Sequence, residues 1–185
     1  AVLNDLLLGN NVDLSAAGTP PFMVLWDKTV GNIGVKGVST LNAQPSFLNT
    51  NRPNIRSLRD FTDKDKIALP SVRVSFQAIT LQMAAEKEFG VGQRTKLDHL
   101  TVSLAHPEGV AALLSGQSEI TGHFTSPPFQ YQELEDPKIS RVLSSYDYTG
   151  KASFSALSAT TRFVQDNPKT YAALLAALKE ATDII

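Results

Sequence analysis

A stretch that occurs twice constrains the fold of this chain more than any other feature. The first copy covers residues 9–22 and the second residues 116–129, and the two align without a gap. Each begins with glycine after an apolar segment and ends in Pro-Pro-Phe, with Thr19 or Ser126 directly before the first proline. The second copy starts about one small domain's length after the first.

Each copy has the sequence signals of a strand between two helices. The glycine is typical of the residue that ends a helix. A short strand is expected at 12–16 and at 119–123, and Thr19 and Ser126 are expected to cap a new helix whose first turn begins with proline. Helix N-termini at the carboxyl ends of strands favour anions, so two such edges facing each other would form a ligand cleft. Turn chemistry shared by coincidence remains the alternative.

A third junction of the same type is predicted between the two copies. Residues 66–70 read as a strand closed by proline, residues 71–75 as a loop, and residues 75–89 as a helix capped by Ser75. Strands alternate with helices elsewhere too, which predicts an α/β protein with mostly parallel sheets. Trp26 is expected to pack in the core from a helix at 20–29.

Composition excludes several classes of function. The 17 basic and 18 acidic residues are balanced, and no basic stripe with interleaved aromatics is present, so nucleic acid is not an expected partner. No apolar run has the length of a membrane span, and no signal peptide is visible. Cysteine is absent, which excludes disulfides and thiolate chemistry. Both ends of the chain read as helix, so we expect a piece of something longer.

The residues that carry chemistry point to binding rather than to catalysis. The three histidines lack metal-ligand spacing, and no nucleotide-binding or serine-hydrolase motif appears, so we expect no metal, no cofactor and no catalytic residue. His106, followed by proline, is expected in a loop. His123 falls at the end of a predicted strand, where it is either a hydrogen-bonded, partly buried residue or a donor to a ligand.

Several segments, taken in order and spacing, carry a family resemblance over nearly the whole chain. They are residues 7–13 with 17–20, 57–61 leading to 66–70, 111–116 with 126–129, and 163–172 around Asn167-Pro168. In these segments the chain resembles the substrate-binding proteins of ABC importers of the nitrate/sulfonate/taurine family. That family has the bilobal, type II periplasmic-binding-protein fold.

The resemblance implies a role in import. A small solute, anionic or aromatic, would lie between two lobes and be delivered to a membrane permease by a monomeric protein outside the cytoplasm, in the periplasm or extracellular space and membrane-associated through the transporter. Lobe one would comprise residues 1–50 and 150–185, and lobe two residues 51–149. Family members open with a strand–helix–strand unit before the position of Ala1 and continue past Ile185, so lobe one is expected to be incomplete.

The resemblance also implies a set of ligand contacts. Helix termini and Arg73 would hold an anionic head group, and Phe124 would pack against an organic body. Arg73 could equally be a solvated loop residue. The expected ligand-binding residues are Gly18, Thr19, Ser46, Arg73, Ser75, His123, Phe124 and Pro127.

Two other functions on the same fold remain open at this point. Thiamine-pyrimidine synthases look similar, but they rely on a cysteine-rich motif and this chain has no cysteine. A sensory ligand-binding domain would have the same fold and a different output. A signal peptide in the full coding sequence would favour import, whereas a helix-turn-helix would favour regulation.

Overall fold

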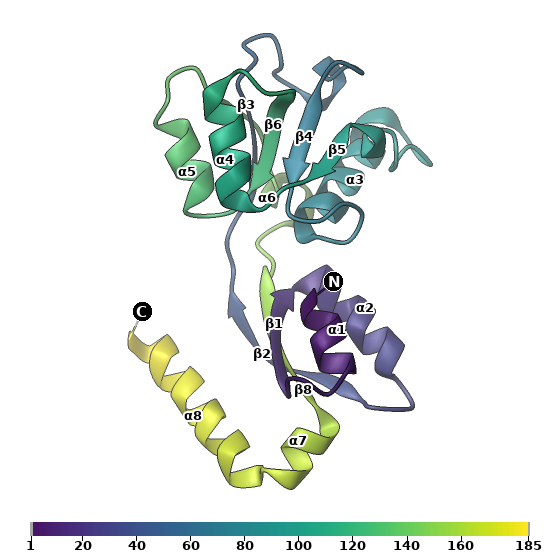
Figure 1. The fold of residues 1–185 in the computed structure, drawn as a ribbon, viewed down its shortest axis with the longest axis vertical. Coiled ribbons are helices and arrows are strands. Elements are labelled where there is room, and N and C mark those ends of the chain that lie inside the picture. The colour runs from purple at the N-terminus through teal and green to yellow at the C-terminus, as the bar shows by residue number, and fades with distance from the viewer. Residues whose placement is uncertain (1, 185) are drawn as a thin grey trace. The chain divides into compact units, whose positions relative to one another are not determined.

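The computed structural model describes residues 2–184 and divides into two compact units (Figure 1). One unit runs up to Leu41 and resumes at Ser155, and the other is Asn42–Phe154. The boundaries expected from the sequence, after residue 50 and before residue 150, differ because β3 (Phe47–Thr50) pairs within the second unit. The second unit also includes Phe154, whose backbone N–H donates to the Asn42 carbonyl at 2.9 Å.

The first unit is built on a three-stranded sheet of order β1–β8–β2. Strand β1 (Leu14–Gly18) runs antiparallel to β8 (Ser155–Thr160), and β2 (Val35–Asn42) lies on the other side of β8. Its helices are α1 (Val2–Leu8), α2 (Thr19–Thr29), α7 (Thr161–Asp166) and α8 (Pro168–Ile184).

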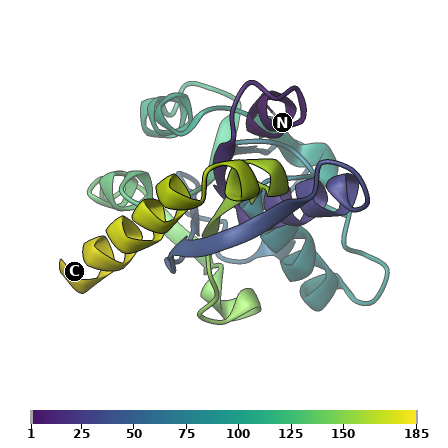
Figure 2. The same cartoon turned by 90° about the horizontal axis from the view of Figure 1, so that it is seen from below.

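The described core of the first unit is small. Leu7, Leu25 and Val35 are buried together, one each from α1, α2 and β2. The expectation that Trp26 packs in the core is wrong, because Leu25 and Thr29 occupy the buried side of α2 and leave Trp26 50% exposed. Helix α8 has no buried residue, and Figure 2 shows it in yellow, projecting beyond the sheet of its own unit.

The second unit is built on a five-stranded mixed sheet of order β5–β4–β6–β3–β7. Strand β4 pairs in parallel with β5 and β6, whereas β3 is antiparallel to β6 and β7. The α/β class is confirmed, but the sheets are mixed rather than mostly parallel, because β3 and the β1–β8 pair run against their neighbours. The remaining strands are β4 (Lys66–Leu69), β5 (Thr101–Ser103), β6 (Ile120–Thr125) and β7 (Ser140–Ser144).

Helices cover both faces of this sheet. They are α3 (Phe76–Phe89), α4 (His106–Ser115), α5 (Phe129–Leu134) and α6 (Tyr146–Thr149), with single turns η1 (Leu58–Asp60) and η2 (Asp98–Leu100).

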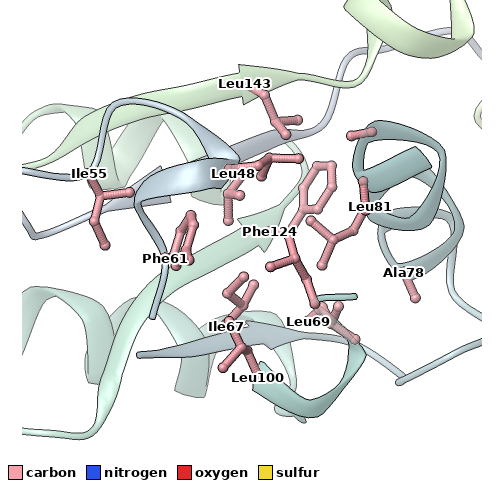
Figure 3. Packing of buried hydrophobic residues seen from close by; sticks show 14 residues of the cluster. Leu48, Ile55, Phe61, Ile67, Leu69, Ala78, Leu81, Leu100, Phe124 and Leu143 are labelled. Atoms are coloured by element: carbon pink, nitrogen blue, oxygen red, sulfur yellow. The ribbon is translucent and has the colours of Figure 1, made fainter. Parts of the chain in front are cut away.

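Alternation along the strands divides the core in two. Leu69, Phe124 and the α3 residue Leu81 pack on one face (Figure 3), and Ala68 packs with Leu113 of α4 on the other. The two faces of β6 therefore meet different helices.

Within residues 2–184, no helix is both long and apolar enough to cross a bilayer.

The two copies of the duplicated stretch share local turn chemistry but not strand pairing. Strand β1 is an edge strand with an antiparallel neighbour, whereas β6 is central and parallel to β4. Gly18, not Thr19, is the cap of α2, and Thr19 is its first helical residue. In the second copy Ser126 is not the cap either, because α5 begins only at Phe129. The interpretation of both copies as one structural unit is therefore wrong beyond the strand-to-helix order.

Candidate functional site

Four strands of the second unit end, and the fifth begins, at one edge of its sheet. The parallel strands β4, β5 and β6 end there at Leu69, Ser103 and Thr125. Strand β3 runs the other way and begins there, with Phe47 opposite both Thr125 and Ser144. We call this side of the sheet the carboxyl edge.

Three helices start at the carboxyl edge. Helix α3 follows β4, α4 follows β5, and α5 follows β6 (Figure 1). A helix N-terminus carries a partial positive charge and backbone N–H groups without helical partners. Because α3 and α4 have 14 and 10 residues, they are the main contributors, and α5 has only 6. The edge therefore has the electrostatic character of an anion-binding site.

Ser75 holds the N-terminus of α3. Its hydroxyl accepts a hydrogen bond from the Ala78 N–H at 3.1 Å, and its own N–H donates to the Ser71 carbonyl at 3.2 Å. The sequence-based prediction of Ser75 as a helix cap is confirmed. These bonds fix the loop between β4 and α3 at the carboxyl edge.

Ser46 brings the first residues of β3 and the end of β7 together. Its N–H donates to the Ser145 hydroxyl at 2.9 Å, and its carbonyl accepts from the Ser145 N–H at 2.8 Å. The Ser46 side-chain oxygen is buried and has no hydrogen-bond partner within the described residues. Burying a hydroxyl without a hydrogen-bond partner lowers the stability of the folded protein, unless another group such as a ligand bonds to it.

His106 belongs to the carboxyl edge, although the sequence analysis expected it in a loop. It is the first residue of α4, its Nδ1 lies 2.8 Å from the Thr125 hydroxyl, and its Nε2 has a long contact of 3.5 Å to the Ser126 hydroxyl. The ring of Phe129 lies beside it, with 5.4 Å between ring centres. The sequence contains a signal for this position: residues 101–107 have the strand-then-proline order of the other strand-to-helix junctions, which places His106 at the start of a helix.

The imidazole of His106 is neutral near pH 7. Burial, and then the charge of His123, lower its pKa from 6.5 to about 4. A neutral imidazole donates from one nitrogen and accepts at the other, which suits its position between two hydroxyl groups. Positive potential at the edge therefore comes from the helix termini.

Arg73 lies in the loop between β4 and α3, with a positive φ of 67°. Its side chain is exposed and lines a hollow of about 570 Å³ beside α3, together with Arg94, Asp98 and His99. The structure thus places the guanidinium on the flank of α3 next to the edge. Both expectations for Arg73, a ligand contact and a solvated loop residue, stay open.

His123 and Phe124 lie in the interior, not at a surface that a ligand could reach. Both side chains are completely buried. His123 faces α4 and α5, where its Nδ1 is bonded to the Glu133 carboxylate, and Phe124 packs on the opposite face against α3. The placement of these two residues in a ligand cleft is corrected accordingly, because consecutive residues of a central strand point into opposite covered faces.

The other expected contacts lie at chain turns. Pro127 is partly buried in the loop between β6 and α5. Gly18 and Thr19 lie in the first unit, as the cap and the first residue of α2. Their role as ligand contacts stays a prediction.

Comparison with known proteins identifies the fold. No protein-family model matches the chain, and no curated protein sequence matches it. Solved structures show that the chain has the fold of periplasmic binding proteins, which confirms the expectation from the resemblance.

The similar structures include solute-binding proteins of bacteria. The alkanesulfonate-binding protein of Xanthomonas axonopodis pv. citri, solved with MOPS, has a TM-score of 0.73 and 15% identity, over 97% of this chain and 58% of that one. The aliphatic sulphonate-binding protein of Escherichia coli gives 0.67 and 16%, over 96% and 57%. The nitrate-binding protein of Synechocystis gives 0.69 and 16%, over 98% and 50%. This chain therefore spans between 50% and 58% of the length of these proteins.

Proposed function

We propose that this chain is part of a solute-binding protein of an ABC importer. It captures a small anionic or aromatic organic solute of the nitrate, sulfonate or taurine kind and delivers it to a membrane permease. The observation that carries the proposal is the carboxyl edge of the second unit, where α3 begins at its cap Ser75 and α4 begins at His106, whose ring is bonded to the Thr125 hydroxyl. Helix N-termini and hydroxyl groups bind an oxyanion without supplying a reactive group.

The fold supports this proposal. Similar solved structures are named as sulfonate- and nitrate-binding proteins, and they are described as periplasmic. In this proposal the two units are the two lobes, and the second contributes its carboxyl edge to the ligand site. The protein acts as a monomer in the periplasm or extracellular space, reaches the membrane through its permease, and is not an enzyme.

The proposed ligand contacts are revised by the burial of two side chains. Ser46, Arg73, Ser75 and Pro127 of the second unit remain in the set. His106 joins them. His123 and Phe124 leave it because helices cover both faces of β6, whereas Ser46, although equally buried, lies at the carboxyl edge and has a hydroxyl without a partner within the described residues. Gly18 and Thr19 remain the proposed contribution of the first unit.

Calorimetric titration tests the proposal. The protein encoded by the complete coding sequence is titrated with nitrate, methanesulfonate, taurine and benzenesulfonate. Saturable binding of at least one of these anions, with a dissociation constant in the micromolar range or below, supports the proposal. Absence of binding to all of them overturns it.

One variant separates binding from folding. Ser46→Ala removes a buried hydroxyl that has no partner within the described residues, so we expect no loss of stability. The same change is expected to weaken anion binding about tenfold, the value of one hydrogen bond to a charged group. Ser115→Ala, at the exposed C-terminal end of α4, is the matched control. Equal affinities of Ser46→Ala and wild type would remove Ser46 from the site.

A further inference from the structure

The edge of the five-stranded sheet opposite the carboxyl edge contains a basic hollow. Thr50 at the end of β3 lies opposite Ser140 at the start of β7, so the chain leaving β3 and the chain entering β7 meet there. Between them lies a hollow of about 640 Å³. Its walls include Arg56, Lys138 and Arg141.

The charges around this hollow are of one sign. Three of its lining residues are cationic and none is acidic. Their side chains form no ion pair within residues 2–184, where the ion pairs involve other residues. Like charges that face a common concave surface repel one another and raise the local concentration of anions.

Two carboxylates of the same loops accept hydrogen bonds from the backbone. Asp60 accepts from the backbone N–H of Arg56 at 3.0 Å, and Asp136 accepts from the backbone N–H of Lys138 at 2.9 Å. Hydrogen bonds from the Arg56 N–H and from Ser57 hold the pKa of Asp60 below its usual value, so this carboxylate stays charged. These acids hold the two loops in shape. The charge of Arg56 also lowers the pKa of Asp60, but neither Arg56 nor Lys138 forms a direct ion pair within residues 2–184.

Arg141 is held in place by an aromatic ring. Its guanidinium carbon lies 4.7 Å from the centre of the Phe47 ring, and Phe47 in turn contacts Tyr131 edge to face. Phe47 pairs with Ser144, so this contact draws the guanidinium along β3 toward the carboxyl edge, and Arg141 lines the hollow from that side. The walls beside the cations are formed by Pro53 and Pro137, which limit the backbone freedom of the two loops.

We propose that this hollow is a second anion site, which binds a small molecule carrying a phosphate group. Arginine and lysine together suit phosphate, because the guanidinium fork pairs with two oxygens and the ammonium adds a point charge. A dianionic phosphate also balances more of the three positive charges than a monoanionic sulfonate or nitrate does. The volume lies within the range of small-molecule pockets and exceeds what inorganic phosphate alone needs, so a phosphate ester with a small apolar body against the prolines is the expected class.

NMR titration of the isotope-labelled chain locates and tests the site. The probes are phenyl phosphate, inorganic phosphate and benzenesulfonate. Amide shifts confined to residues 51–56 and 137–141, saturable with phenyl phosphate and weaker with the other two probes, support the proposal. Shifts centred on residues 69–75, or no saturable shift with either phosphate probe, overturn it.

Charge-removing variants provide the second test. Arg56→Gln and Lys138→Gln are each expected to weaken phenyl phosphate binding about tenfold, since each removes one charged hydrogen-bond donor. Lys64→Gln, an exposed lysine away from the hollow, is the control and should bind as wild type does. A similar loss in all three variants would show non-specific attraction and overturn the site. Calorimetry with benzenesulfonate in the same variants keeps this result separate from the carboxyl edge, where no change is expected.

Discussion

The imidazole Nδ1 of His123 is hydrogen-bonded to the carboxylate of Glu133, and both side chains are completely buried. The other carboxylate oxygen of Glu133 accepts from the Asn49 amide at 2.8 Å. The bonds join β6, α5 and β3 beneath the carboxyl edge. A buried polar network of this kind holds its elements in one arrangement as long as each member keeps its partner.

Replacing Glu133 tests how much this network stabilises the fold. In Glu133→Gln the amide oxygen can accept from Asn49, but the amide NH2 can meet His123 Nδ1 only when the imidazole carries its proton on Nε2. Nε2 is buried and has no hydrogen-bond partner within the described residues, so a buried N–H is left without an acceptor. We expect a loss of about 2–4 kcal/mol in the free energy of unfolding. Urea denaturation measures it. Glu135→Gln, on the exposed side, is the control and should change stability by less than about 0.5 kcal/mol. Equal effects of the two changes would contradict a structural role for the pair.

Gly109 of α4 lies directly against the His123 ring. A Cβ added at Gly109 would be 2.3 Å from His123 Nε2, and the ring cannot move away because it is buried and bonded to Glu133. Gly109→Ala gains about 1 kcal/mol of helix propensity but costs about 1–3 kcal/mol through overpacking, so we expect a net loss of stability. Thermal and urea unfolding measure it. Introducing the same change into a His123→Ala background should abolish the loss, and an undiminished loss there would contradict the clash.

Ser75 is expected to matter for stability as well as for binding. Ser75→Ala removes the hydroxyl that accepts from the Ala78 N–H at the start of α3. The free energy of unfolding should fall by about 1 kcal/mol, as for other helix caps. The comparison with Ser140→Ala in urea denaturation controls for the loss of a serine hydroxyl. A Ser75→Ala chain as stable as that control would show that water or a neighbouring group replaces the cap.

His106 predicts a pH dependence of stability. Its folded-state pKa of about 4 lies below the usual 6.5, so the unfolded chain binds a proton in this range and the folded chain does not. The free energy of unfolding therefore falls as the pH decreases from about 6.5 to about 4, and this contribution is constant below that range. Denaturation at a series of pH values should give a shallower slope for His106→Gln than for wild type. The same pH dependence in His106→Gln and wild type would show that the pKa of His106 is not lowered in the folded protein.

Signals that act within a few residues could be read from the sequence. Ser75 caps α3, and Gly116 ends α4 in the left-handed conformation with φ of 62°. The strand at 66–70 and the helix at 75–89 were predicted nearly to their bounds. Caps, helix-ending glycines and short apolar runs depend on neighbours along the chain, which is why the sequence alone determined them.

The tertiary structure decided the direction of β3 and the surroundings of β6. Nothing local to residues 47–50 shows that they run against β6 and β7, because strand pairing depends on residues far along the chain. The same holds for His123 and His106. His123 is enclosed because α4 and α5 cover its face of the sheet, and His106 reaches the carboxyl edge because β5 ends beside β4 and β6. Burial is a property of what packs on both faces of a strand, and only the assembled sheet and its helices determine that.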